Sequence, residues 1–323
     1  MQYGEIPYVD KPVSRLFYGT ASMPFVAGGD GGELLDAMLA LGVNAIDTAR
    51  VYGMSEASIG QWMASRHCRE RVVLLTKGGH PDSEGRRRIS EADIRGDIET
   101  SCEMLQTGYI DIYLLHRDDP EVPVGVIVEL LNALHEEGRI GAFGGSNWTV
   151  ERIAEANAYA AEHGLIPFSV SSPNFGLAEQ VADPWGGGCV TVSGPSNAAA
   201  RAWYAARRMP VIAYSSLGRG FFSGRVFSGD AARVGELLDP PAVKGYACPA
   251  NFERLRRCEE LSARKGVTVP QLAMRWIFAQ ELNTFAVVST SSPARMQQNI
   301  DALQIPLTAQ EADYLDLRAA HWA

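Results

Sequence analysis

Short apolar runs alternate with longer amphipathic segments along almost the whole chain, and this alternation constrains the fold more than any other feature. Such alternation is typical of repeated βα units, which build a parallel sheet. Eight parallel strands can close into a barrel that leaves no unpaired edge. We therefore predict a single (β/α)8 barrel domain, a TIM barrel, over residues 1–323, with strands at 15–19, 43–47, 72–77, 110–115, 140–145, 168–172, 211–215 and 284–289.

The segments between these strands carry helix signals. In VGVIVELLNALHEEG, the glycine Gly138 is placed to end a helix. The long gap between the seventh and eighth strands predicts extra helices near 252–265 and 270–280, and Pro270 suits the first turn of the second one.

One segment after the sixth strand has neither pattern. Residues 176–195 include DPWGGGCVTVSGP, which predicts a long irregular loop. In a barrel of this kind, loops that follow strands lie on the C-terminal face, where function resides.

Composition excludes several classes of protein. The formal net charge of −9 over 323 residues lacks the basic surface that nucleic-acid binding needs. No stretch approaches the roughly 20 apolar residues of a membrane span, and the N-terminal residues do not resemble a signal peptide. The five cysteines form no C-x-x-C pair, so neither a disulfide framework nor a metal site is indicated. We expect a cytoplasmic protein that acts on a small molecule; the sequence does not indicate its oligomeric state.

Four ionisable residues occur at or just after the ends of three neighbouring predicted strands. Asp47 ends the second strand and Tyr52 follows it, Lys77 ends the third, and His116 follows the fourth. Because the C-terminal ends of barrel strands converge on one mouth, we expect these side chains to meet. Unpaired charges in such apolar surroundings would be costly, so they are best interpreted as partners.

This group could perform acid catalysis. Lys77 would lower the pKa of the Tyr52 phenol, Asp47 would hold the ammonium, and His116 would direct a donor to the same place. Each residue also has a structural alternative: a strand-end aspartate can cap a helix, a tyrosine can be core, and a histidine can be a satisfied turn residue. Their occurrence together at matching strand ends favours the shared site.

The chain resembles the aldo-keto reductases, NAD(P)H-dependent carbonyl reductases with a (β/α)8 fold, over nearly its full length. DTARVYGMSE, LLTKGG and IYLLHRDDP are similar to three of that family's segments, in the same order. The resemblance implies that Tyr52 is the general acid, that Lys77 lowers its pKa, that Asp47 is the counter-ion of Lys77, and that His116 orients the substrate carbonyl.

The same resemblance implies a cofactor site. GGSNW places Ser146 and Asn147 at the nicotinamide carboxamide, and in SSPNFGL, Ser172 replaces the usual glutamine and Phe175 the stacking tyrosine. AYSSLGRGFFSGR resembles a pyrophosphate loop, and VSTSSPARMQQNI resembles an adenosine clamp. The further cofactor contacts implied are Gly19, Thr20, Asp47, Tyr214, Ser215, Leu217, Gly218, Gly220, Ser289, Thr290, Ser291, Arg295, Gln298 and Asn299.

The resemblance also bears on the choice of cofactor. Arg295 matches an arginine that engages a 2′-phosphate, whereas Ser289 stands where some members carry a second cation. One arginine can still bind phosphate in bidentate fashion, so NADPH is favoured and NADH remains possible. No G-x-G-x-x-G follows the first strand, so a Rossmann-type site is not indicated.

Candidate substrate contacts lie near the predicted mouth. Arg117 and Asp118 follow His116, and Trp148 and Trp185 are candidate walls. The arginines at 86–88 could bind an anionic substrate, although a short charge run is usually a solvated loop.

Three functions remain open from the sequence. The first is an oxidoreductase that reduces an aldehyde or ketone with NADPH, and the second is an NAD-dependent alcohol or sugar dehydrogenase that works oxidatively. The third is a nucleotide-binding regulatory barrel without turnover, which would not require the four ionisable residues. A metal-dependent hydrolase is disfavoured because only one of the four is a histidine.

Overall fold

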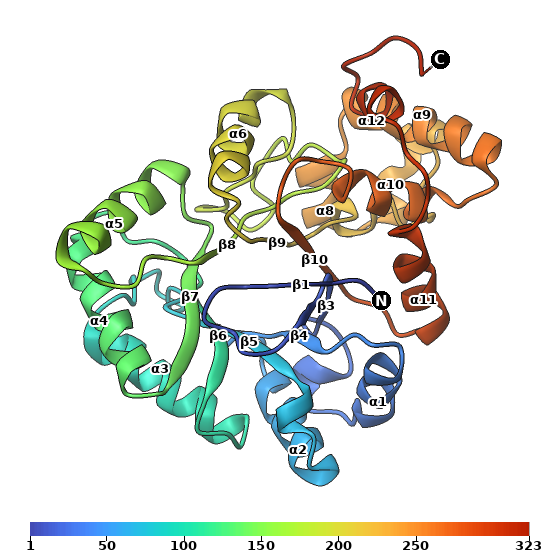
Figure 1. Ribbon diagram of the computed structural model, residues 1–323. Helices are drawn as coiled ribbons and strands as arrows, with labels where there is room; N and C mark the ends of the chain where they lie inside the picture. The colour runs from blue at the N-terminus through green and yellow to red at the C-terminus, as the bar shows by residue number, and fades with distance from the viewer. Residues whose placement is uncertain (323) are drawn as a thin grey trace.

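Eight parallel strands close into a barrel at the centre of the molecule (Figure 1). The computed structural model describes residues 1–322. Each strand lies beside the next one in sequence, and the last pairs with the first. This confirms the predicted (β/α)8 barrel. Its strands are β3 (Leu16–Gly19), β4 (Ala45–Asp47), β5 (Val73–Gly78), β6 (Ile110–Leu115), β7 (Ile140–Ser146), β8 (Val170–Ser172), β9 (Val211–Ala213) and β10 (Thr284–Val288).

Helices surround the barrel because the outward side chains of the strands and the apolar helix faces bury one another. One helix follows each strand from β3 to β8: α1 (Gly32–Ala40), α2 (Ser55–Arg66), α3 (Glu91–Met104), α4 (Val124–Glu136), α5 (Val150–His163) and α6 (Ala198–Arg207). After β9 come α7 (Val234–Leu237), α8 (Pro240–Tyr246), α9 (Pro249–Lys265) and α10 (Val269–Ile277), and after β10 come α11 (Pro293–Ala302) and α12 (Ala309–Leu315).

The helix ends follow the signals in the sequence. Gly138 adopts the left-handed conformation, φ 70°, just after α4 ends. Pro270 lies in the first turn of α10, where the Thr268 hydroxyl accepts the amide hydrogen of Gln271 and the Gln271 side chain accepts the amide hydrogen of Thr268. The two extra helices predicted between the seventh and eighth strands are α9 and α10.

An N-terminal hairpin closes the other end of the barrel. Strands β1 (Tyr3–Gly4) and β2 (Val13–Ser14) pair antiparallel, and Ile6 and Val13 are buried with the side chains that fill the barrel interior. The sequence pattern does not predict this hairpin, because two-residue strands are too short to show an alternating pattern.

The register of the central strands sets the level of the site. Asp47 pairs with Gly19 of β3 and Leu75 of β5, and Lys77 pairs with Leu114 of β6. The last residues of these strands therefore lie at neighbouring levels of one barrel end.

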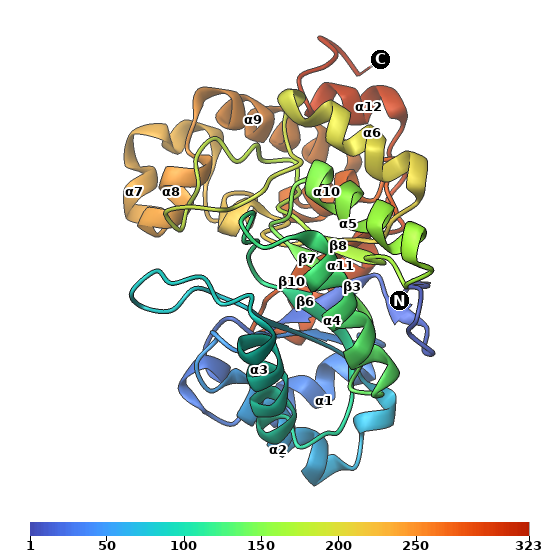
Figure 2. The ribbon, with the colours of Figure 1, turned by 90° about the vertical axis from the view of Figure 1, so that its left-hand side faces the viewer.

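The loops that surround the mouth are long. Figure 2 shows the loop between β5 and α3, together with α7 and α8, on the side of the molecule away from the N-terminus. Residues 176–195 are largely irregular, as predicted, apart from a bridge between Thr191 and Asn174. Within residues 1–322, none of the helices has the length and apolarity needed to cross a membrane.

Candidate active site

A cavity of about 1350 Å³ opens at the C-terminal end of the barrel. Its wall is built by the ends of β3 to β7 and by the segments that follow β9 and β10. Asp47, Tyr52, Lys77 and His116 all line it. The structure thus brings the four strand-end residues into one cavity.

Lys77 and Asp47 form a buried ion pair in this wall. The Lys77 Nζ donates to Oδ1 of Asp47 at 2.5 Å and to the carbonyl oxygen of Thr48 at 2.9 Å. The two side chains are only 4% and 7% exposed. A buried ammonium without such acceptors would be strongly destabilising, so the pair fixes both the position and the charge of Lys77.

A tight turn presents Tyr52 to the cavity. The Tyr52 amide donates to the carbonyl of Ala49 at 3.0 Å, and the next residue, Gly53, has φ 57°. A Cβ at Gly53 would lie 2.4 Å from the carbonyl oxygen of Val26. The turn requires glycine both for its left-handed conformation and for this close backbone approach.

Tyr52 lies beside the Lys77 ammonium, with Nζ 5.1 Å from the ring centroid. Burial raises the pKa of Tyr52, and the positive charge of Lys77 opposes that rise. For Lys77 itself, burial acts to lower the pKa, but Asp47 and Tyr52 more than offset it and raise the pKa. The lysine is therefore charged and the phenol protonated at neutral pH. The Lys77 charge acts to lower the pKa of Tyr52, but burial raises that pKa by more.

His116 faces Tyr52 from the end of β6. The two ring centroids lie 5.8 Å apart, and the ring of His80 lies 5.0 Å from that of His116. Burial, together with the charges of Lys77 and Arg117, holds the pKa of His116 well below its usual range. Its buried Nδ1 has no hydrogen-bond partner within residues 1–322. The imidazole is thus neutral and can donate one hydrogen bond.

A polar wall follows β7 and β9. The Tyr214 hydroxyl donates to Oδ1 of Asn147 at 2.7 Å, and the Ser146 hydroxyl donates to the carbonyl of Ser172 at 3.0 Å. Ser146, Asn147 and Tyr214 line the cavity. Ser172 does not, because its hydroxyl donates instead to the carbonyl of Ile212 at 2.8 Å.

Phe175 lies outside the cavity, which corrects its assignment as a stacking residue. Its ring is fully buried and packs against Trp276, with centroids 5.6 Å apart. The preceding residue, Asn174, forms bridges to Thr191 and Tyr214, so the next side chain points to the opposite face and into the core. Tyr214, which follows β9, is an aromatic residue that does line the cavity.

The loop after β9 lines the cavity through Ser215, Leu217 and Gly220. The amides of Gly218 and Gly220 donate within the loop, to the carbonyls of Ser215 and Leu217 at 2.8 and 3.2 Å. These two amides are therefore not available to an anion, contrary to expectation. The amides of Ser215 and Leu217 make no hydrogen bond within residues 1–322 and remain available.

The segment after β10 forms the next part of the wall. The Ser289 hydroxyl is hydrogen bonded to the hydroxyl of Ser22 at 2.8 Å, and the Ser292 hydroxyl caps α11. Ser291 is exposed and lies outside the wall. The predicted adenosine contacts that do line the cavity are Ser289, Thr290, Arg295, Gln298 and Asn299.

Thr20 stabilises the backbone instead of lining the cavity. Its hydroxyl donates to the carbonyl of Asp47 at 2.8 Å and accepts from the hydroxyl of Ser55 at 2.7 Å. It therefore holds the end of β4 from behind the cavity wall.

Asp118 and Trp148 are also turned away from the cavity. Asp118 is paired with Arg152 at 3.2 Å. Trp148 is completely buried against Phe168, with ring centroids 5.0 Å apart, because Gly145 leaves room for the indole. Arg117 and Trp185 do line the cavity.

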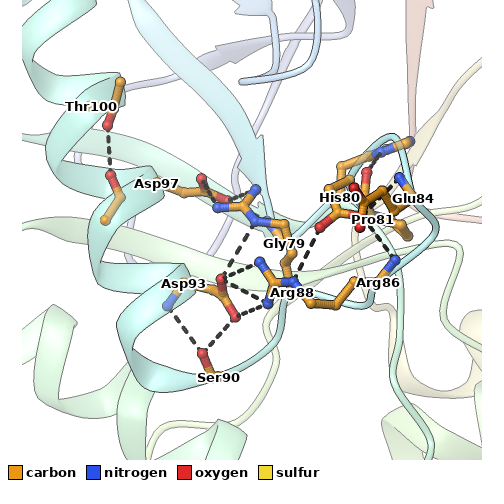
Figure 3. Close-up of polar contacts among 12 residues, drawn as sticks. Gly79, His80, Pro81, Glu84, Arg86, Arg88, Ser90, Asp93, Asp97 and Thr100 are labelled. Atoms are coloured by element: carbon orange, nitrogen blue, oxygen red, sulfur yellow. Dashed lines mark hydrogen bonds and ion pairs between the residues drawn. The ribbon is translucent and has the colours of Figure 1, made fainter.

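The arginine run at 86–88 is paired with carboxylates. Figure 3 shows Arg86 and Arg88 near the start of α3, where they contact Asp93 at 3.4 and 3.5 Å. Arg88 also pairs with Asp97 at 2.7 Å. Arg87 pairs with Asp119 at 2.6 Å. These ion pairs hold the loop onto the protein, so the run is not a free site for an anionic substrate.

Several cavity residues were missed from the sequence. His80 comes three residues after Lys77, and its Nδ1 lies 2.8 Å from the carbonyl oxygen of Pro81. Arg219 and Arg225 lie within the loop segment already assigned to pyrophosphate. The sequence does contain an indication that these two arginines line the cavity, because both lie in a glycine-rich segment after a predicted strand.

Comparisons with known proteins identify the family of the chain. The model of the Aldo/keto reductase family matches residues 15–318. Aldo-keto reductase YhdN of Bacillus subtilis is 28% identical over 92% of this chain and 87% of its own length. The aryl-alcohol dehydrogenase GME11368 of Pestalotiopsis microspora is 27% identical, over 88% of this chain and 71% of its own, and the probable aryl-alcohol dehydrogenase AAD4 of Saccharomyces cerevisiae is 26% identical, over 88% and 86%. With its closed eight-strand barrel, this chain belongs to the aldo/keto reductase family of oxidoreductases.

Proposed function

We propose that the protein reduces an aldehyde or ketone to an alcohol by hydride transfer from NADPH, with Tyr52 as the general acid. The observation that carries the proposal is the contact of Lys77 with Asp47 and Tyr52 in the cavity wall, opposite His116. A dinucleotide supplies the hydride when bound; the protein supplies position, a proton and electrostatics.

The cavity suits a dinucleotide phosphate in size and in charge. Arg225 and Arg295 line it, and neither makes an ion pair within residues 1–322. The free amides of Ser215 and Leu217 lie on the same wall. Together these groups would hold the phosphates, while Tyr214 offers a ring face to the nicotinamide.

The proton step rests on four side chains. Neutral His116 would hydrogen-bond the carbonyl oxygen and hold it near the Tyr52 hydroxyl. As negative charge develops on that oxygen, Tyr52 would donate its proton to it. The nearby Lys77 charge stabilises the phenolate that remains, and Asp47 keeps that charge in place.

A second candidate is the oxidative reaction with NAD. Ser289 supplies a hydroxyl near the end of the cavity assigned to the 2′-phosphate, where a second cation would favour NADPH. Two of the relatives are named aryl-alcohol dehydrogenases. Tyr52 would then act as the base.

A titration with each nucleotide separates the candidates. Binding of NADPH and NADH would be followed by fluorescence, and turnover by the nicotinamide absorbance with aldehydes, ketones, alcohols and sugars. Tighter binding of NADPH with reduction of aldehydes supports the first candidate. Preference for NAD with faster oxidation supports the second, and binding without turnover would support a regulatory barrel instead.

A further inference from the structure

The cavity is strongly basic although the whole chain is acidic. Its wall contains one acidic side chain, Asp47, within the part of the chain that the structure describes, and the formal charge of the chain is −9. The Lys and Arg side chains in the same wall are Lys77, Arg117, Arg219, Arg225 and Arg295. This distribution favours anionic ligands.

Most of these cations are already accounted for. Lys77 is paired with Asp47 at 2.5 Å, and Arg219 with Asp239 at 3.0 Å. Arg225 and Arg295 follow β9 and β10 and, under the proposed function, meet the phosphates of the cofactor. Arg117 remains.

Arg117 lies on the other side of the barrel from the cofactor phosphates. It follows β6, and three strands separate β6 from β10 in each direction around the closed sheet. It is also the residue next to His116, whose ring faces Tyr52. A charge here is near the reacting carbonyl and far from the Arg295 end of the cavity.

The guanidinium of Arg117 is poorly satisfied by the protein. One nitrogen donates to the carbonyl of His116 at 3.2 Å, and another to the sulfur of Cys189 at 3.6 Å. No carboxylate lies within ion-pair distance of it in residues 1–322. A guanidinium has five N–H donors, so most of its hydrogen-bonding capacity faces the cavity or solvent.

The acidic residues nearest in sequence or space have other partners. Asp118 pairs with Arg152 and Asp119 with Arg87. The carboxylate of Asp183, on the loop above, accepts the amide hydrogens of Trp185 and Cys189 at 2.7 and 2.9 Å. Arg117 is therefore kept free of internal ion pairs while its neighbours are paired.

We propose that the substrate is a carbonyl compound that also carries a carboxylate, and that Arg117 binds this carboxylate while the carbonyl lies between Tyr52 and His116. The inference rests on the proposed reductase function and names its substrate class. A single guanidinium matches the two oxygens of a carboxylate in a bidentate contact, whereas a phosphate would leave an oxygen without a charged partner here.

The test compares a charged aldehyde with its neutral ester, 4-carboxybenzaldehyde and the corresponding methyl ester. We expect wild type to reduce the acid at least about tenfold more efficiently in kcat/KM. Arg117→Met should lower kcat/KM for the acid by roughly tenfold to a hundredfold and leave the ester nearly unchanged. Arg117→Lys should recover part of the loss, since it keeps the charge without the fork.

Arg87→Gln is the matched control, because it removes a positive charge near the mouth whose side chain is already paired. It should leave the ratio of acid to ester unchanged. Thermal denaturation of each variant would establish that it is folded. Equal efficiency for acid and ester in wild type, or an equal loss of both in Arg117→Met, would overturn the inference while reduction of the ester still supports the proposed function.

A binding measurement decides the question without turnover. Calorimetric titration of benzoate and methyl benzoate, which carry no alcohol to oxidise, into the protein with NADP⁺ should show tighter binding of the acid in wild type, lost in Arg117→Met. A preference for phenyl phosphate over the benzoate in the same titration, or equal affinities for acid and ester, would contradict the carboxylate assignment.

Discussion

Lys77 donates a hydrogen bond of 2.5 Å to Asp47, and both side chains are almost completely removed from solvent. The ammonium is thereby held as a charged neighbour of the Tyr52 ring. This pair connects the stability of the barrel end to the proposed proton transfer, because neither charge is sustainable there without the other.

Asp47→Asn should reduce both stability and activity. The buried ammonium loses its counter-charge, so the free energy of unfolding should fall by about 3 kcal/mol. The pH profile of kcat/KM for reduction should also shift, since the apparent pKa of the donor belongs to the coupled group. Denaturant unfolding and pH profiles, measured where both proteins are folded, would check this. An unchanged profile with full activity would reduce Asp47 to a structural cap.

The reaction should depend on pH through Tyr52. Burial raises the pKa of Tyr52, so the donor stays protonated through neutral pH and reduction should fall only on the alkaline side. Lys77 opposes that rise, so Lys77→Met should move the alkaline limb to still higher pH and slow alcohol oxidation at neutral pH. The check is kcat/KM against pH in both directions. An alkaline limb at the same pH in the variant would show that Lys77 does not act on Tyr52.

Arg295→Ala should weaken NADPH much more than NADH. If Arg295 makes charge-assisted hydrogen bonds to the 2′-phosphate, the additional loss should be roughly tenfold to a hundredfold. Fluorescence titration of both nucleotides measures it. Arg233→Ala serves as control, since Arg233 lies outside the cavity wall beside Asp230. Equal losses for both nucleotides would place the phosphate elsewhere.

Gly53→Ala should displace Tyr52. The added Cβ would clash with the Val26 carbonyl in a turn that already requires φ 57°, so we expect a loss of more than about 1 kcal/mol in stability together with a lower kcat. Gly164→Ala is the matched control: φ is 66°, nothing lies within 4 Å of the new Cβ, and the site is remote. A Gly53 variant that is merely destabilised, with normal kcat, would show that the turn does not position the acid.

The sequence predicted the barrel and the meeting of Asp47, Lys77 and His116 because all three lie at or next to strand ends. In a closed parallel sheet, the position of a residue along its strand determines which residues share a level. The prediction depended on the strands alone and not on the conformation of any loop, and it was therefore correct.

Residues beyond the strand ends were harder to place. Phe175 and Trp148 lie after the pleat has ended, where side-chain direction depends on bridges such as that of Asn174 with Tyr214, and on space left by Gly145. The sequence also could not predict that Arg117 makes no ion pair within residues 1–322. This depends on its acidic neighbours, which are paired with arginines distant in sequence.

The most direct test of the account is Tyr52→Phe, which removes only the hydroxyl. We expect kcat for NADPH-dependent aldehyde reduction to fall by roughly a hundredfold to ten-thousandfold, the usual effect of losing a positioned acid. NADPH affinity, measured by fluorescence titration on the same preparation, should change little because the ring remains. A variant that binds NADPH normally and still reduces the aldehyde at a rate near that of wild type would contradict the assignment of Tyr52 as the proton donor.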